Sequence, residues 1–406
     1  MLVRLRRSSK KLWKGLMMVS GRTSSSKRTS RSPATGAGKR SRRTKWRGVW
    51  PMQDGKPVIT QSMVSSFAQC PRETYYGNVL GLRPRLTSRP LTRGTWVHSL
   101  LEERANGHSW QEKHKELIEE ALTKSFEEEA LDLAEQCENI MLSYDWLYRH
   151  DKYTPIKAEL TVERPIFGGK ALYRGRIDLI VQDERGDVWL LDHKTHARLP
   201  DWRYRELAFQ NYSYLWACRK APQYLELGLP QPKGFIYDYV RTEAIRTPTL
   251  TTRGKLSRAV KPNNTTLPVV KKWLKDIGWM TTVAGTELLS IPDDEERAYV
   301  EWFLDEVEHR DHSDTFRRDV MEFSPEQSRR QLKSFLTTAK RMLQYNWDDP
   351  DCVERNLNAC SGYLCNYKDL TIADLMHGTS EIEQKTRYVS TRDPLDYYPN
   401  QKKEKK

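Results

Sequence analysis

Two aspartates and a lysine stand out because their types and spacing suit chemistry on a phosphate ester. Asp178 lies toward the end of one extended run, 170–181, and Asp192 and Lys194 end the next run. The turn-like segment QDERGD separates the two runs, so they are expected to form a hairpin that brings these side chains together. Paired carboxylates bind a hard divalent cation, and an adjacent ammonium group orients or deprotonates water and stabilises charge. The set therefore suits metal-assisted hydrolysis of a phosphodiester.

The same residues also fit a solvent-exposed hairpin with ordinary salt bridges. Three features favour the metal site. The run VWLL, 188–191, is strongly apolar, so charges at its end are costly unless they are paired or bind a metal. His98 can add an imidazole ligand, and the backbone carbonyl of His193 can add an oxygen. Gln210 and Tyr214 share one face of the following helix and can support the lysine or contact phosphate, although ordinary packing against the sheet is the alternative.

The elements that must position these side chains follow from the periodicity of apolar residues. Helical spacing precedes and follows a group of extended runs, which predicts a small mixed sheet flanked by helices. For the first helix, Ser62 or Ser65 is the expected cap. The predicted helices are 60–77, 91–105, 111–125, 127–149, 201–219, 266–277, 293–310 and 325–344, and the predicted strands are 158–166, 170–181, 188–192 and 234–242.

The composition indicates a globular chain with a basic leader. The chain has 406 residues and a net charge of +14, with 37% hydrophobic and 30% charged residues. No apolar run is long enough to cross a bilayer, and 12–19 is too short and interrupted for a secretory signal. Residues 1–56 are rich in Lys, Arg and Ser, and Asp54 is their first acid, which predicts a disordered tail. Such a tail suits phosphate binding, but a transit peptide and a mis-assigned start are alternatives.

Five short motifs in one order resemble a known family. They are Ser66 to Tyr76, with CPR and YY, Gly94 to His98, Gly175 to Asp178 (GRID), Asp192 to Thr195 (DHKT) and Gln210 to Tyr214. This order resembles the RecB-like branch of the PD-(D/E)XK nuclease superfamily, especially bacteriophage exonucleases related to the CRISPR-adaptation nucleases. One departure is the second acid, Asp192, where many relatives carry Glu. The resemblance implies a restriction-endonuclease-like α/β fold, with a mixed-sheet core of the order α-β-β-β-α-β between N- and C-terminal helical regions.

The resemblance also implies roles and partners. The cofactor would be Mg²⁺ or Mn²⁺, and the substrate would be single-stranded DNA or duplex DNA ends. The place of action would be the cytoplasm, that of the host cell for a phage protein, with the mitochondrion as the alternative if the leader is a transit peptide. The implied metal ligands are His98, Asp178 and Asp192, and the implied catalytic and supporting residues are Lys194, Gln210 and Tyr214.

Two other functions stay open. One is a catalytically inactive module that binds DNA ends. The other is a nuclease subunit of a helicase or CRISPR-adaptation complex, or one with a recombination partner. The chain has no Gly-x-x-x-x-Gly-Lys-Ser/Thr motif, so a motor would be a separate chain.

Four of the six cysteines form a pattern of their own. Cys70 opens the CPRETYY segment, and Cys352, Cys360 and Cys365 lie close together near the C-terminus. Without a secretion signal disulfides are not expected, so this clustering indicates a metal or cluster site. Relatives in this branch often carry a 4Fe-4S cluster with one upstream and three downstream cysteines, which this order matches. Zn²⁺ and free thiols are the alternatives.

The predicted organisation has five parts. The nuclease core is bounded on each side by a helical region, and each end of the chain is polar. The parts are a basic tail, 1–56, an N-terminal helical region with Cys70 and His98, 57–150, the nuclease core, 151–245, a C-terminal helical region with the cysteine cluster, 246–383, and a polar tail, 384–406.

Overall fold

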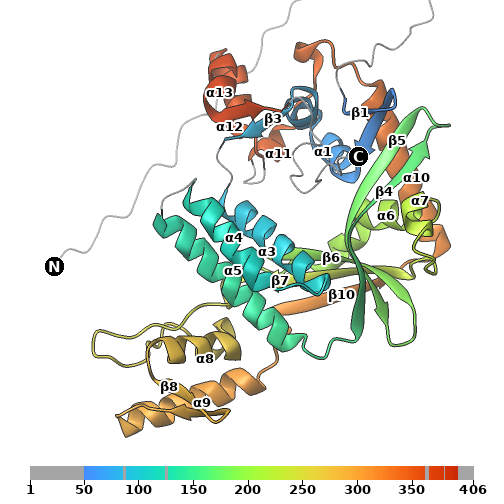
Figure 1. Ribbon diagram of the computed structural model, residues 1–406. Helices are drawn as coiled ribbons and strands as arrows, with labels where there is room; N and C mark the ends of the chain where they lie inside the picture. The colour runs from blue at the N-terminus through green and yellow to red at the C-terminus, as the bar shows by residue number, and fades with distance from the viewer. Residues whose placement is uncertain (1–49, 86–87, 124–126, 362–364, 379, 392–406) are drawn as a thin grey trace, which may run out of the picture. The chain divides into compact units, whose positions relative to one another are not determined.

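The structure, a computed structural model, describes residues 50–85, 88–123, 127–361, 365–378 and 380–391 (Figure 1). Most of the predicted basic tail, 1–49, therefore lies outside the described residues. The rest of that predicted tail is not irregular, because β1 (Met52–Gln53) and β2 (Lys56–Thr60) form there. Within the described residues, no helix has both the length and the apolar content needed to span a membrane.

A seven-stranded mixed sheet forms the centre of the fold, in agreement with the predicted α/β class. The strand order is β1-β2-β5-β6-β7-β10, and β4 pairs with the other edge of β5. β5 is antiparallel to β6, and β6 is parallel to β7. The bounds are β4 Tyr153–Ile166, β5 Ala171–Asp183, β6 Val188–His196, β7 Gly234–Arg241 and β10 Phe316–Glu322.

The predicted hairpin of β5 and β6 is present, but its strands part next to the two aspartates. Their ladder ends at the pair Leu179 and Leu191, and the next residues are Asp178 and Asp192. Further along, the same edge of β5 pairs with β2 at 172–174. Within the described residues, 175–177 pair only with β4. Both aspartates therefore lie inside strands longer than predicted, at a break in the pairing and not at the strand ends.

Helices cover both faces of this sheet. Because side chains alternate along a strand, Leu190 joins the large core beneath α6 (Phe209–Cys218) and α10 (Pro325–Gln344), whereas Leu191 faces the other side. On that other side, α3 (Arg89–Ala105), α4 (Trp110–Leu122) and α5 (Glu127–Leu147) pack side by side (Figure 1). The predicted helix 201–219 is a short 3-10 segment, Trp202–Leu207, followed by α6.

The first predicted helix, 60–77, is interrupted at Cys70. Cys70 is extended, and Pro71 begins the next helix, because a proline disfavours helical backbone in the residue before it. The cap is Thr60, which accepts from the Met63 N–H, instead of Ser62 or Ser65. The segments are α1 Gln61–Gln69, α2 Pro71–Thr74 and a π-helical turn Tyr75–Val79.

The chain between β7 and β10 forms a unit with its own apolar core. The predicted helices there are present as α8 (Leu267–Asp276) and α9 (Asp294–His309). Sequence analysis missed the hairpin between them, β8 (Met280–Val283) and β9 (Thr286–Leu289).

The C-terminal segment folds back onto the N-terminal one. The beginning of the predicted polar tail has regular structure over 384–390, because α13 continues to Arg387 and β11 pairs with β3. The remaining elements are α7 Pro222–Leu225, α11 Leu357–Ser361, α12 Lys368–Ile372, α13 Ser380–Arg387, β3 Leu82–Pro84 and β11 Tyr388–Ser390.

Candidate active site

The first carboxylate of the site, Asp178, is held from two elements. His98 Nδ1 lies 3.2 Å from Asp178 Oδ2, and the backbone N–H of His193 donates to the same oxygen at 3.1 Å. His98 lies on α3, one turn after Gly94. The structure thus brings together one helix and the β5–β6 hairpin at this carboxylate.

The second carboxylate, Asp192, is only 2% exposed and is also held twice. Lys194 forms an ion pair with its Oδ2, and Gln210 Nε2 donates to its Oδ1 at 2.5 Å. Asp192 and Lys194 are two residues apart on β6, so their side chains leave the same face of the strand. Gln210 lies in the first turn of α6, which covers that face.

Burial and neighbouring charges set the protonation of these groups. Burial raises the pKa of Asp192, with Lys194 opposing this effect and the charge of Asp178 adding to it. Burial also acts upward on Asp178, but His98 outweighs it through charge and a hydrogen bond, so the pKa of Asp178 falls well below its usual range. For His98, burial lowers the pKa and Asp178 raises it more, which leaves it above the ordinary value. Each of these groups thus acts on the pKa of at least one of the others: the two carboxylates, the His98 imidazole and the Lys194 ammonium group.

The motif glycines lie where a second element approaches the backbone closely. A Cβ built on Gly175 would lie 2.8 Å from Cε1 of Tyr214, so the tyrosine ring lies directly against the GRID strand. A Cβ built on Gly94 would lie 3.2 Å from Oγ1 of Thr195, the residue after Lys194. Gly175 therefore requires a residue without a side chain, whereas at Gly94 the Thr195 hydroxyl can rotate away from an added Cβ.

Sequence analysis missed two charged residues in the sheet beside the site, Asp238 and Arg318. Asp238 on β7 is in register with His193 on β6 and with Arg318 on β10. Asp238 Oδ2 lies 3.1 Å from His193 Nδ1, and Asp238 Oδ1 lies 3.2 Å from Arg318 Nε. One signal was available, because Asp238 interrupts the otherwise apolar run GFIYDYV. Arg318 lies in a segment that gave no strand prediction.

The side chains present fit a divalent cation by donor type. His98, Asp178 and Asp192 offer one imidazole and two carboxylates, which suit Mg²⁺ or Mn²⁺. In the described part of the chain, however, no three His, Cys, Asp or Glu side chains already stand in ligand geometry. At this site both carboxylates are already neutralised, Asp192 by Lys194 and Asp178 by His98. A bound cation would take over part of that neutralisation.

Three of the four predicted cluster cysteines come together. The Cys360 thiol interacts with those of Cys70 and Cys365, and its pKa is raised by burial and by Cys70. Burial raises the pKa of Cys365 to about 11. Cys352 differs, because it is exposed and its thiol donates to Asp349 Oδ2 at 3.0 Å. The described residues thus contain a three-thiol group to which Cys352 is not joined.

The CPRETYY motif links the two ends of the described chain. Arg72 lies 2.5 Å from Asp374 Oδ2, and Arg355 forms an ion pair with the same oxygen. The Asn356 N–H donates to the Cys70 sulfur at 3.4 Å. These contacts hold the segment around Cys70 against the C-terminal segment, where α11 carries Cys360 and the loop before α12 carries Cys365.

Comparisons with known proteins identify a family and a solved structure with weak similarity. A family model described as the PD-(D/E)XK nuclease superfamily matches residues 58–370. A search of curated proteins found no match. Among solved structures, the crystal structure of SSO0001 is 17% identical with a TM-score of 0.20, over 45% of this chain and 62% of that chain. This chain thus spans less than two thirds of that relative, and a TM-score this low supports no inference.

The family match extends well beyond the motifs, which cover about 60–215. It includes the N-terminal helices, the hairpin with both aspartates, and β10 with Arg318. More than half of the chain is matched, and the mixed sheet and its flanking helices are those expected for such a core. We conclude that the chain belongs to the PD-(D/E)XK nuclease superfamily.

Proposed function

We propose that this protein is a metal-dependent DNA exonuclease of the RecB-like branch, acting on single strands or on DNA ends. Nucleases of this superfamily are typically metal-dependent phosphodiesterases. The main support is the convergence of Asp178, Asp192 and Lys194 at the break between β5 and β6. A module that only binds DNA gains nothing from burying two carboxylates beside one another, because such burial is costly. The order of the motifs supports a role in phage DNA recombination, repair or processing.

Each residue has a distinct part in the proposed reaction. His98, Asp178 and Asp192 would hold Mg²⁺ or Mn²⁺, with the His193 carbonyl as a further donor. When bound, the cation acidifies a coordinated water and neutralises charge on the phosphate. Lys194 orients the attacking water and stabilises the negative charge that builds up on the scissile phosphate. Gln210 keeps the Asp192 carboxylate aligned by donating to its second oxygen.

A basic groove supports DNA as the partner. The turn between β4 and β5 and one side of α10 line a groove of about 440 Å³. Within the described residues, its three cationic side chains have no hydrogen-bond or ion-pair partner, so they are available to phosphates. An aromatic side chain in the groove can stack on an unpaired base. The cations are Arg329, Lys333 and Lys340, and the apolar lining residues are Phe167, Leu332 and Leu336.

Cleavage of end-labelled DNA tests the nuclease activity. Wild type, Lys194→Ala and the exposed-lysine control Lys157→Ala are each incubated with single- or double-stranded DNA, with Mg²⁺, Mn²⁺ or a chelator. Wild type and the control should degrade DNA only with metal, and Lys194→Ala should not. Resistance of circular single strands would support exonuclease action, and their cleavage would contradict it. Activity that survives both chelation and Lys194→Ala would refute the mechanism, and DNA binding without cleavage would favour the inactive module.

We also propose that Cys70, Cys360 and Cys365, with Cys352 as the fourth ligand, bind a 4Fe-4S cluster, with Zn²⁺ as the alternative. Support comes from the Cys360 thiol, which interacts with the thiol of Cys70, far away in the sequence, and with that of Cys365. Anaerobic purification followed by iron, zinc and sulfide analysis tests this. Iron and visible absorbance should be present in wild type and in the buried-cysteine control Cys137→Ala, and absent in Cys360→Ser. Wild type without iron or zinc would leave the free-thiol interpretation.

A further inference from the structure

We propose that Asp238 and Arg318 are positioning residues that orient His193, and through it both carboxylates, for cation binding. This role presupposes the metal-dependent activity proposed above. It is carried by a row of three side chains, His193, Asp238 and Arg318, which stand in register across the neighbouring strands β6, β7 and β10. The row runs from the edge strand β10 to β6, the strand that carries Asp192 and Lys194 of the candidate active site.

His193 is the link between this row and the site. Its imidazole Nδ1 contacts Asp238, while its backbone N–H donates to Asp178. It also lies between Asp192 and Lys194 on β6, and side chains alternate along a strand. Holding the His193 ring on one face therefore directs Asp192 and Lys194 to the other. One anchored side chain thus sets the direction of three groups of the site.

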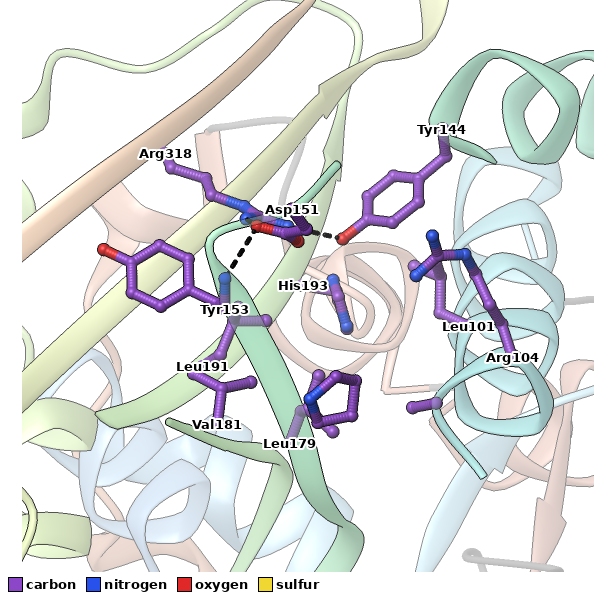
Figure 2. Close-up of a pocket in the computed structure, with 12 residues that line it drawn as sticks. Leu101, Arg104, Tyr144, Asp151, Tyr153, Leu179, Val181, Leu191, His193 and Arg318 are labelled. Carbon is purple, nitrogen blue, oxygen red and sulfur yellow. Dashed lines mark hydrogen bonds and ion pairs between the residues drawn. The ribbon is translucent and has the colours of Figure 1, made fainter. Parts of the chain in front are cut away.

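The anchor itself has little freedom. Asp238 is 0% exposed, and Tyr144 donates to its Oδ2 at 2.5 Å while Arg318 lies against its Oδ1. Arg318 is held in turn by Asp151 at 2.6 Å. Figure 2 shows His193, Tyr144, Asp151 and Arg318 around one narrow cavity. That cavity measures about 10 Å³, the least that one water molecule needs, so the protein supplies nearly all the partners of these charges.

The charges of the row are balanced. Burial raises the pKa of Asp238, but Arg318 and His193 outweigh it and hold that pKa well below its usual range. The Asp238 carboxylate is therefore ionised, and its Oδ2 faces Nδ1 of the His193 ring at 3.1 Å. At its other end the row reaches the site, because the ring centroids of His193 and His98 are 6.1 Å apart and the His193 N–H donates to Asp178.

A positioning role and a merely stabilising role make different predictions. A buried ion pair typically contributes little stability compared with apolar residues of similar size. If the row only stabilised the fold, removing both charges together would therefore change neither the fold nor Mn²⁺ binding. Orientation of His193, in contrast, needs the carboxylate acceptor itself, because second partners of this kind fix the orientation of metal-site groups.

The test measures Mn²⁺ affinity of the full chain without DNA, by calorimetry and by EPR. Asp238→Asn should weaken Mn²⁺ binding by about 10–100-fold. The matched control is Asp319→Asn, on β10 next to Arg318 and paired with Arg317. The control should bind as wild type does. The nitrogen NMR signals of the His193 ring should shift in Asp238→Asn, which loses the neighbouring carboxylate, and stay unchanged in Asp319→Asn.

Should Asp238→Asn unfold, the double variant Asp238→Asn with Arg318→Met removes both charges and serves in its place. A folded variant of either kind with wild-type Mn²⁺ affinity would overturn the positioning role, even while the enzyme cuts DNA. Wild type that binds no Mn²⁺ would overturn the proposed metal-dependent function, and this role with it. The two failures are thus distinct.

Discussion

Replacing Gly175 with alanine should strain the core beneath the site. The new Cβ would lie 2.8 Å from Tyr214 Cε1, whereas carbon atoms in contact keep about 3.5–4.0 Å. The ring must therefore move by about 0.7–1.2 Å, the difference between these distances. Tyr214 is 8% exposed and packs against Phe235, with ring centroids 6.4 Å apart, so little room exists for that movement. Overpacking of this kind lowers the free energy of unfolding by about 1–3 kcal/mol.

The same movement should reach Asp192. Tyr214 lies one turn along α6 from Gln210, whose amide holds Asp192. A misplacement of about 1 Å can slow an enzymatic reaction by about 100-fold. We therefore expect the rate of DNA cleavage to fall by roughly 10- to 100-fold. Gly94→Ala is the control, because the Thr195 hydroxyl at 3.2 Å can rotate away. Alanine inside helix α3 should also stabilise it, by up to about 1 kcal/mol.

Urea unfolding and single-turnover cleavage measure both effects. Combining Gly175→Ala with Tyr214→Leu removes the ring that clashes, so the double variant should lose less stability than the sum of the single losses. The reasoning is refuted if Gly175→Ala is as stable and active as wild type. It is also refuted if the two losses simply add, because the residues would then not be in contact.

Three further outcomes are expected. Lys194→Ala should lower the single-turnover cleavage rate by about 10²- to 10⁴-fold. DNA affinity, measured by anisotropy, should stay nearly constant. An equal loss of affinity would indicate that Lys194 binds DNA instead. Arg329→Glu with Lys333→Glu should make the slope of log affinity against log salt shallower by about 1.4 for single-stranded DNA, at about 0.7 per phosphate contact, and an unchanged slope would remove the groove as a DNA site. Because the pKa of Asp238 is lowered in the folded state, it stabilises the fold above the unfolded pKa of about 3.9, and this stabilisation is lost as the pH falls. Urea unfolding of wild type should therefore weaken more steeply than that of Asp238→Asn from about pH 4 downward, and parallel curves would contradict this.

Local patterns in the sequence predict the β5–β6 hairpin and most helices of the chain, because alternation and helical spacing depend only on residues close together in the sequence. The apolar run before Asp192 and the turn QDERGD suffice to place Asp178 near Lys194. The chemistry of the site is local in the same way, since Lys194 follows Asp192 on one strand.

Long-range pairings are the part that sequence patterns leave out. The edge strand β10, FRRDVME, has three adjacent charged residues, so it lacks the run of apolar residues that predicts a strand. Its pairing with β7 follows a long intervening segment, and the parallel pairing of β2 with β5 is equally non-local. The register that sets Asp238 between His193 and Arg318 is a property of these pairings. No spacing along the chain reveals it.

The position of β10 has a consequence for synthesis on the ribosome. Arg318 is made 80 residues after Asp238, which at about 5–20 residues per second is a delay of about 4–16 s. During that time both aspartates and Lys194 already exist, but Asp238 lacks its cationic partner, and burying an unpaired carboxylate is costly. The growing chain can thus complete the candidate active site only after the unit of α8 and α9 has been translated. Fragments that stop before β10 should therefore lack the proposed nuclease activity.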